Sequence, residues 1–598
     1  MLPRSKNRYF ATAISLAVSA GFLVSAPVQA ARYVPPVAFQ ELALKSYARQ
    51  AVATSVISTI QPVTTVPTFT LVGITWSGKV DATSVFQVRV REKGIWSSWQ
   101  NLTWSSEHGP DLASAEDRKA RNGTDPLLTA AADSIEARVT NKTGILPSDL
   151  KLALSNSNQT TQDKSLIAKR SLLGDVEPYV TSPQGAVVPR PRIISRAEWG
   201  ADETWRDADA AMGTGIIAGF MHHTASTNAY AADQGPAQMR ALYSYYTKGL
   251  HYKDLAYSFL VDRYGNIYEG RSGCPRLITT PCDGPSMPAV GAHTAAMNVN
   301  TFAVSVIGNY QTENPPAENL AAIVNGVSSV MAWKIAPYGL KPDGYSDVPV
   351  GADPDNLSRY AEGDVAHIQT ISGHRDVGRT VCPGQYLYPA LPDIRAKINA
   401  LLTPAIRDAS ISPTAVDISS ANTVNLSAYA PAGAQWSMQV TNQADGTVVH
   451  TQSGTAADAG IIASTWNRTN TQGAPVAEGK FVASIAMTVN GVALPVASST
   501  VLVTSAPTKP AVTLSKYVSK TKRTITWAAT SSLTPTTYKY RTYSSKTRKW
   551  SGWKTTVNSG TSVALSNLVL KRRYQIQVQA TNALGTSPVV TYAFTHKK

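Results

Sequence analysis

Cysteine is scarce in this chain, which has only three cysteines among its 598 residues. So few cysteines exclude a small disulfide-rich scaffold. Beyond the N-terminal region, no stretch approaches the roughly 18 consecutive apolar residues that a membrane-spanning helix needs. The H-E-x-x-H motif is also absent, which argues against a zinc peptidase whose metal ligands come from a helix carrying that motif. The chain is too long for one hydrophobic core, so we expect several domains.

The N-terminus has the pattern of an export signal. Three basic residues precede an apolar run from Phe10 to about Val24, and Val28-Gln29-Ala30 forms a small-residue cleavage site. A membrane anchor is the alternative, but the run is short for a span. We therefore expect residues 1–30 to be removed. The mature protein is expected to be secreted, cell-wall associated or periplasmic, with no transmembrane helix.

Export makes disulfides possible. Cys274 and Cys282 flank a short loop, which favours one disulfide between them and leaves Cys382 for another role. Three reduced thiols are the alternative, but exposed thiols rarely persist outside the cell.

Acidic residues are missing from residues 506–598, which contain 16 Lys or Arg and no Asp or Glu. The net charge of the whole chain is +16, so the remainder is balanced. A surface of one sign concentrates polyanions near it, so anionic cell-wall polymers are candidate partners. Nucleic acid is not expected, because no helix-turn-helix or zinc-finger spacing occurs. A solubility feature is the alternative.

Composition and periodicity predict a multidomain chain with an α/β centre and β-rich flanks. Phe86–Arg91 alternates apolar and polar residues like a half-buried strand, whereas strands alternate with helices from Arg192 to about Leu402. Gly339–Asp364 is rich in Gly, Pro and Asp, and is predicted to be a long loop. The predicted divisions are 1–30 signal peptide, 31–69 N-terminal segment, 70–156 all-β domain, 157–191 linker, 192–402 mixed sheet covered by helices, and 405–504 and 506–598, two β-sandwiches.

Histidine and cysteine form the most informative pattern. An apolar strand ends in His222-His223, and Cys382 follows His374 by eight residues. Alternation along a strand puts His222 and His223 on opposite faces, so one is expected to face a metal and the other to pack or cap. Two neutral imidazoles and a thiolate, with a fourth position open for water, suit a catalytic zinc. For His222-His223 alone, a buried structural histidine is the alternative.

Six motifs occur in a characteristic order between residues 192 and 402. They are Ser195-Arg196-Ala197-Glu198-Trp199-Gly200, His222-His223-Thr224-Ala225, Leu255–Val261, Gly265–Arg271, Gly291-Ala292-His293-Thr294 and Gly373–Gly384. This third of the chain resembles the peptidoglycan recognition proteins, which belong to the type 2 N-acetylmuramoyl-L-alanine amidases.

The resemblance implies an exported zinc amidase that cleaves the bond between N-acetylmuramic acid and L-alanine in peptidoglycan. It implies Zn²⁺ held by His222, His374 and Cys382. Tyr257 matches the catalytic tyrosine, and Thr380 sits where the family has Thr or Lys beside the zinc. Both hydroxyls can donate to a developing oxyanion. A core aromatic and a loop-capping hydroxyl are the respective alternatives.

Three further residues are predicted to bind substrate on the strength of the resemblance: His293, His223 and Arg271. The carrier of the proton to the leaving amine stays open between His293 and water. Relatives carry a Gly-Trp or Asn-Phe pair where this chain has Ser272-Gly273, so stem-peptide preference is not carried over. A non-catalytic peptidoglycan-binding or wall-scaffolding protein is the alternative function, because some animal relatives lack a ligand and only bind.

The flanking regions carry weaker resemblances. The β-rich segment 73–155 and residues 339–364 resemble exported actinobacterial amidase-like proteins. Residues 405–504 look like an Ig-like domain. Residues 506–598 look like fibronectin type III, with Tyr574 near the tyrosine-corner position.

Overall fold

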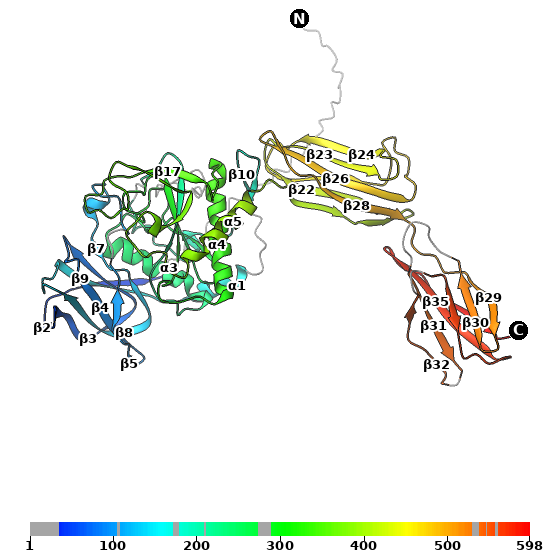
Figure 1. Ribbon diagram of the computed structural model, residues 1–598, viewed down its shortest axis with the longest axis horizontal. Coiled ribbons are helices and arrows are strands. Elements are labelled where there is room, and N and C mark those ends of the chain that lie inside the picture. The colour runs from blue at the N-terminus through cyan, green and yellow to red at the C-terminus, as the bar shows by residue number, and fades with distance from the viewer. Residues whose placement is uncertain are drawn as a thin grey trace, which may run out of the picture.

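Four units follow one another along the chain (Figure 1). The computed structural model describes residues 35–104, 108–170, 179–207, 211–272, 289–528, 537–545, 547–556 and 560–598. The first two units lie side by side, and two smaller β units follow them. The predicted signal peptide and the predicted Cys274–Cys282 pair lie outside the described residues.

The first unit is one antiparallel sheet. Its central order is β1-β9-β3-β8-β4-β5, and β2, β6 and β7 attach at its margins. The strands are β1 (Val37–Ala43), β2 (Ala48–Val52), β3 (Ser55–Ser77), β4 (Val85–Glu92), β5 (Ile95–Trp96), β6 (Gln100–Leu102), β7 (Asn122–Gly123), β8 (Leu127–Asn141) and β9 (Ser148–Ser157).

This sheet begins well before the predicted boundary at residue 70. Strand β3 starts at Ser55, within the segment predicted as a separate 31–69 stretch. Val, Ile and Thr are frequent in its first half, and these β-branched residues favour strands over the irregular segment expected from its prolines. Several register shifts along β3 and β8 accommodate the irregular part of the sequence.

The region predicted as a linker, 157–191, also contains ordered elements. They are α1 (Thr161–Arg170), β10 (Tyr179–Thr181) and β11 (Val187–Pro189). Strands β10 and β11 pair as a hairpin, and Val187 packs into the core of the third unit. The prolines of this segment favour a linker, but the apolar residues between them, such as Val187 and Val188, are buried against neighbouring units.

The second unit is built on a mixed sheet of order β12-β15-β14-β16-β13-β19. All neighbouring pairs are parallel except β14 with β15. The strands are β12 (Ile193–Ile194), β13 (Ala218–His223), β14 (Phe259–Val261), β15 (Ile267–Glu269), β16 (Thr301–Val306) and β19 (Ile371–Gly373). The helices are α2 (Arg196–Trp199), α3 (Gly235–Ser244), α4 (Ala317–Ile335) and α5 (Leu391–Leu402).

Helices cover both faces of this sheet, in agreement with the predicted α/β architecture. One core joins α4 and α5 to the sheet through residues such as Val327 and Ile394. A second core joins α3 to the opposite face and includes Met239 and Leu242. Among the described residues, Ala317–Tyr338 is long and apolar enough to cross a membrane, but 67% of its apolar window is buried in the protein.

The predicted long loop 339–364 contains half of a hairpin. Strand β17 (Tyr345–Pro349) pairs antiparallel with β18 (Val365–Gln369). Alternate residues of both strands, such as Val348 and Ala366, are buried in a small core. Some of the Gly, Pro and Asp residues that suggested a loop precede β17, and others, such as Gly351 and Pro354, lie in the connection between β17 and β18.

Each C-terminal unit has two sheets around one core. The third unit comprises β20 (Arg407–Ser412), β21 (Ala415–Asp417), β22 (Val424–Ala430), β23 (Gln435–Asn442), β24 (Val448–Thr455), β25 (Gly460–Trp466), β26 (Gly479–Val489), β27 (Val492–Ala493) and β28 (Ala497–Thr504). The fourth comprises β29 (Val512–Ser519), β30 (Lys522–Trp527), β31 (Thr537–Ser544), β32 (Lys549–Trp550), β33 (Lys554–Thr555), β34 (Ser562–Leu565), β35 (Arg573–Asn582), β36 (Gly585–Thr586) and β37 (Val590–Thr595). The Ig-like and fibronectin-like comparisons stay predictions. The Tyr574 hydroxyl does accept a bond from the Val569 amide at 2.8 Å, as a tyrosine corner would.

The first two units share a hydrophobic core. Leu71 and Ala153 of the first sheet pack in the same cluster as α3. Tyr245 inserts between the units and donates from its hydroxyl to the Thr124 carbonyl at 2.6 Å. A Cβ atom at Gly73 would lie 2.4 Å from the Tyr245 ring, so only glycine leaves room for it. The two units therefore form one continuous body.

A buried ion pair fastens this body. The Arg240 guanidinium on α3 bonds both carboxylate oxygens of Asp163 on α1, at 3.0 and 2.8 Å, and both side chains are at most 2% exposed. Removing one partner of such a pair leaves a buried charge, which costs about 3–5 kcal/mol. We expect Asp163→Asn to lower the melting temperature of the transition that contains the first two units.

Asp133→Asn is the matched control. Asp133 pairs with Arg91 in the first sheet, but both side chains are substantially exposed, so solvent screens the pair and this change should cost little stability. Differential scanning calorimetry measures both variants. Equal melting temperatures for the two would contradict the structural role of the buried pair.

Candidate metal centre

Strands β13 and β19 bring two histidines to the same edge of the sheet. The strands are parallel neighbours, and Met221 lies opposite Gly373 in their register. His222 and His374 are the next residues along the chain, His222 still within β13 and His374 just after β19, so both lie at the same end of the sheet. His374 opens a short 3₁₀ turn, and the chain then returns with Cys382. Both imidazoles and the thiol are buried.

The return of Cys382 depends on Gly384. A Cβ atom at this position would lie 2.3 Å from the Tyr310 carbonyl carbon, and its φ is +95°. Only glycine adopts this conformation and this close approach without strain. The Cys382-Pro383-Gly384 motif thus carries the sulfur back against the end of β13, where the amide of His223 donates to it at 3.4 Å.

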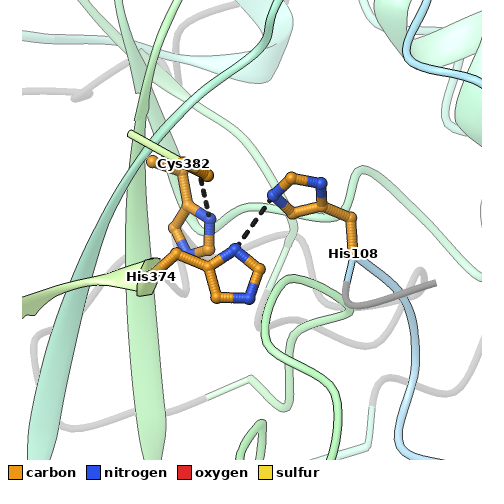
Figure 2. Close-up of side chains that lie close together, drawn as sticks. His108, His374 and Cys382 are labelled. Carbon is orange, nitrogen blue, oxygen red and sulfur yellow. Dashed lines mark hydrogen bonds between the residues drawn. The ribbon is translucent and has the colours of Figure 1, made fainter. Parts of the chain in front are cut away.

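Four side chains converge on one point: His222, His374, Cys382 and His108. Their possible ligand atoms all lie within 4.8 Å of one another. Cys382 Sγ is 3.6 Å from His222 Nδ1, and His374 Nδ1 is 3.0 Å from His108 Nε2. Figure 2 shows the His108 ring facing His374 from a separate segment of the chain. The sequence predicts the first three as a set, but it does not predict His108.

The donor set fits zinc. Zn–S and Zn–N bonds of about 2.3 and 2.0 Å at a tetrahedral angle separate sulfur from nitrogen by about 3.5 Å. The distance between Cys382 Sγ and His222 Nδ1 matches this separation. Imidazole nitrogen and thiolate sulfur are also the ligands that zinc prefers.

Burial keeps these imidazoles neutral. It lowers the pKa of His108 to about 4 and holds the pKa values of His222 and His374 well below their ordinary value. Neutral rings keep the lone pairs that metal binding requires. The protein therefore presents unprotonated nitrogens at neutral pH.

Thr294 is a second site residue that the sequence analysis did not single out, although it ends the Gly291–Thr294 motif. Its hydroxyl lies 3.3 Å from His222 Nε2 and 3.0 Å from His293 Nδ1. A partner on the ring nitrogen that faces away from the metal fixes the orientation of a ligand histidine. Thr294 is placed to do this for His222, whose other nitrogen faces Cys382.

His293 lies beside this cluster. Its ring centroid is 5.4 Å from that of His222, and burial lowers its pKa to about 3. Its Nε2 atom is buried without a hydrogen-bond partner among the described residues. His293 is thus neutral at rest, and its Nε2 atom is a buried polar atom without a partner among the described residues.

His223 points away from the cluster. Its Nδ1 accepts a bond from the Tyr310 amide at 3.1 Å, and burial lowers its pKa to about 3. His222 and His223 therefore lie on opposite faces of the strand, as alternation along a strand predicts. The assignment of His223 to substrate binding stays a prediction, with one of its ring nitrogens already engaged by the backbone.

Tyr257 and Thr380 take different positions around the cluster. The Tyr257 ring lies 5.2 Å from that of His222, and burial raises its pKa well above the ordinary value, so it keeps its phenolic proton. Thr380 is half-buried, and its hydroxyl accepts a bond from the Cys382 amide at 3.2 Å. This bond ties the Thr380 hydroxyl to the ligand loop, and the assignment of Thr380 to catalysis stays a prediction.

Arg271 is held by the first unit. Its guanidinium bonds both carboxylate oxygens of Glu116, at 2.9 and 2.7 Å, and donates to the Leu255 carbonyl at 2.6 Å. Burial disfavours the charge on Arg271, but the Glu116 carboxylate outweighs it and raises the pKa. A residue predicted to contact substrate is here occupied by a neighbouring unit of the same chain.

An α/β sheet with two histidines and a cysteine at one end defines a candidate metal centre. Comparison with family models identifies its kind. Residues 215–385 match the family described as N-acetylmuramoyl-L-alanine amidase, and residues 26–165 match a family described as Rv3811 N-terminal galactose-binding domain-like. The resemblance found in the sequence is confirmed: this part of the chain is an amidase-family domain.

Curated relatives match the same third of the chain. Peptidoglycan-recognition protein SC2 of Drosophila simulans is 24% identical over 196 residues, which cover 33% of this chain and 82% of that protein. An N-acetylmuramoyl-L-alanine amidase of Homo sapiens is 27% identical over 203 residues, covering 34% of this chain and 28% of that protein. Among solved structures, Drosophila PGRP-LB is 23% identical, covers 33% of this chain and 92% of that one, and gives a TM-score of 0.23.

Zinc content tests the ligand set. We expect Cys382→Ser to lose most of its bound metal, because a hydroxyl is a poor zinc ligand compared with a thiolate. Metal analysis of the purified full-length protein measures this. His223→Gln is the control on the adjacent position of the strand and should keep its zinc. Stoichiometric zinc in Cys382→Ser would contradict the assignment.

Proposed function

We propose that this protein is an exported zinc-dependent amidase that hydrolyses the bond between N-acetylmuramic acid and L-alanine in peptidoglycan. The amidase family match and the names of the relatives support the class of reaction. The observation that carries the proposal is the convergence of His222, His374 and Cys382 beside a protonated Tyr257.

The donor set would hold the metal, and the surrounding side chains would act on the substrate. A zinc ion at His222, His374 and Cys382 supplies a Lewis acid and lowers the pKa of bound water. The Tyr257 hydroxyl donates to the amide oxygen as it gains negative charge. Thr294 keeps the His222 ring in place.

Hydrolysis requires a proton for the leaving group. Water adds its oxygen to the lactyl carbonyl carbon, the C–N bond to L-alanine breaks, and the amine takes up a proton. His293 has a buried ring nitrogen without a partner among the described residues and lies beside His222. Because His293 is neutral at rest, it would relay a proton from water rather than supply one of its own.

The second candidate is a non-catalytic peptidoglycan-binding or wall-scaffolding protein. Two contacts favour it: Glu116 occupies Arg271, and His108 lies at the fourth corner of the donor set. If His108 fills the fourth position, a metal ion in this domain has no open position for the water that hydrolysis needs. A hydrolysis assay separates the two candidates when it includes a chain without the His108 imidazole.

The assay is mass spectrometry of purified peptidoglycan after incubation with the full-length protein and with His108→Ala. We expect release of stem peptides with a free L-alanine amine, and loss of that release with a chelator. Tyr257→Phe in the same two backgrounds should keep its zinc and lose about 10²–10³ in turnover, the magnitude of one oxyanion donor. Zinc-loaded protein that releases no peptide in either background would support the non-catalytic candidate.

We further propose that the protein acts outside the cytoplasmic membrane, because peptidoglycan lies there and residues 1–30 have the pattern of an export signal. Residues 506–598 would add retention on the wall. This unit carries 16 basic and no acidic side chains, so it is expected to bind anionic wall polymers through many weak contacts.

Deleting residues 506–598 tests this role. The fourth unit has its own core, so the deletion should leave zinc content and the hydrolysis of soluble muropeptides unchanged. It should weaken sedimentation with intact cell walls, and the full-length protein should elute as salt rises. Equal, salt-insensitive sedimentation of both forms would leave the charge as a solubility feature.

A further inference from the structure

We propose that His108 is a fourth protein ligand of the metal centre, and that the first unit thereby holds the amidase site closed. The proposal rests on the proposed function, because it needs a metal at His222, His374 and Cys382. It assigns a metal ligand to a domain outside the amidase family match, which begins at residue 215.

The position of His108 suits a ligand. Its Nε2 atom lies 3.0 Å from His374 Nδ1, and its ring centroid is 5.7 Å from that of His222. Two nitrogens bound to one tetrahedral zinc are separated by about 3.3 Å, close to the first distance. Figure 2 shows the ring opposite His374, with Cys382 on the far side of the same point.

The other edge of the His108 ring faces an acidic side chain. Asp125 Oδ1 lies 3.9 Å from Nδ1. This separation is longer than a hydrogen bond, so the carboxylate acts on the ring through its charge alone. Asp125 belongs to the first unit and precedes β8, so the ring and its acidic neighbour come from the same domain.

The backbone around His108 is anchored to the amidase domain. The Tyr252 hydroxyl donates to the His108 carbonyl at 3.0 Å. The Asn298 side-chain amide donates to the Gly109 carbonyl at 3.1 Å and to the Asp111 carboxylate at 2.7 Å. Tyr252 lies five residues before Tyr257, and Asn298 lies five residues after His293. Hydrogen bonds from the amidase domain therefore hold the backbone of His108 and its neighbours in place beside the cluster.

The same segment also covers a predicted substrate residue. Glu116 makes a two-pronged, buried ion pair with Arg271, and the Lys253 amide donates to its carboxylate at 2.9 Å. Burial raises the pKa of Glu116, but the Arg271 charge outweighs burial and holds it below its ordinary value, so Glu116 stays ionised. One segment, from His108 to Glu116, thus contacts both the metal site and Arg271.

Coordination chemistry gives the consequence. A catalytic zinc keeps three protein ligands and one position open, whereas four protein ligands make a closed site. With His108 bound, no position is left for water. Hydrolysis then requires the segment to withdraw, and the measured rate is reduced by the fraction of molecules in the closed form.

Cobalt substitution tests this without relying on turnover. Co²⁺ replaces zinc in the full-length protein, and its visible absorption reports the ligands. Azide, a small anion, then probes for an open position. We expect azide to leave the absorption spectrum of the unmodified protein unchanged and to shift that of His108→Ala. His367→Ala removes an exposed histidine from β18 and should behave like the unmodified protein.

Glu116→Gln gives a second variant that keeps the imidazole. It weakens the ion pair with Arg271, so azide should reach the metal at lower concentration than in the unmodified protein. Soluble muropeptide hydrolysis by His108→Ala should rise at least about tenfold if the closed form predominates.

The outcomes separate the two proposals. Metal binding with the same azide response in the unmodified protein and His108→Ala would overturn the role of His108. Complete loss of metal from His108→Ala would show a four-ligand structural site and overturn the closed-amidase account. Absence of metal from every form, the unmodified protein included, would instead overturn the proposed function.

Discussion

The candidate site depends on the register of two parallel strands. Because Met221 lies opposite Gly373, the histidines that follow these residues lie at the same level at one end of the sheet. A slip of one residue would exchange His222 for His223 and turn the ligand to the other face. The apolar cores on both faces of the sheet hold this register, since a slip would expose their residues to water. The site is therefore a consequence of core packing.

The same cores explain why the first unit reaches the metal centre. Tyr245, next to α3, fills a space that exists only because residues 73 and 123 of the first sheet are glycines. The buried pair of Arg240 and Asp163 fastens the other side of α3. With the two units packed in this way, His108 lies beside the end of β13. The closed arrangement thus follows from a shared interior.

Much of the amidase-family domain was predictable from sequence, because its chemistry lies in short motifs. Three patterns predicted side chains that the structure brings together. They are the spacing of His374 and Cys382, the His222-His223 pair and the motif around Tyr257. His108 was not predictable in this way, since a contact between domains leaves no periodicity. Its one sequence signal is a histidine in a polar loop of a chain with nine histidines. The strands before residue 70 and the elements of 157–191 were missed because prolines masked segments that tertiary packing buries.

X-ray absorption at the zinc edge of the full-length protein tests the central claim most directly, because it reports the atoms around the metal. The account predicts one zinc per chain, with one sulfur at about 2.3 Å and nitrogens of three imidazoles at about 2.0 Å. A bound zinc without sulfur in its first shell, or surrounded only by oxygen, would contradict the assignment of Cys382 and the histidines as one metal centre.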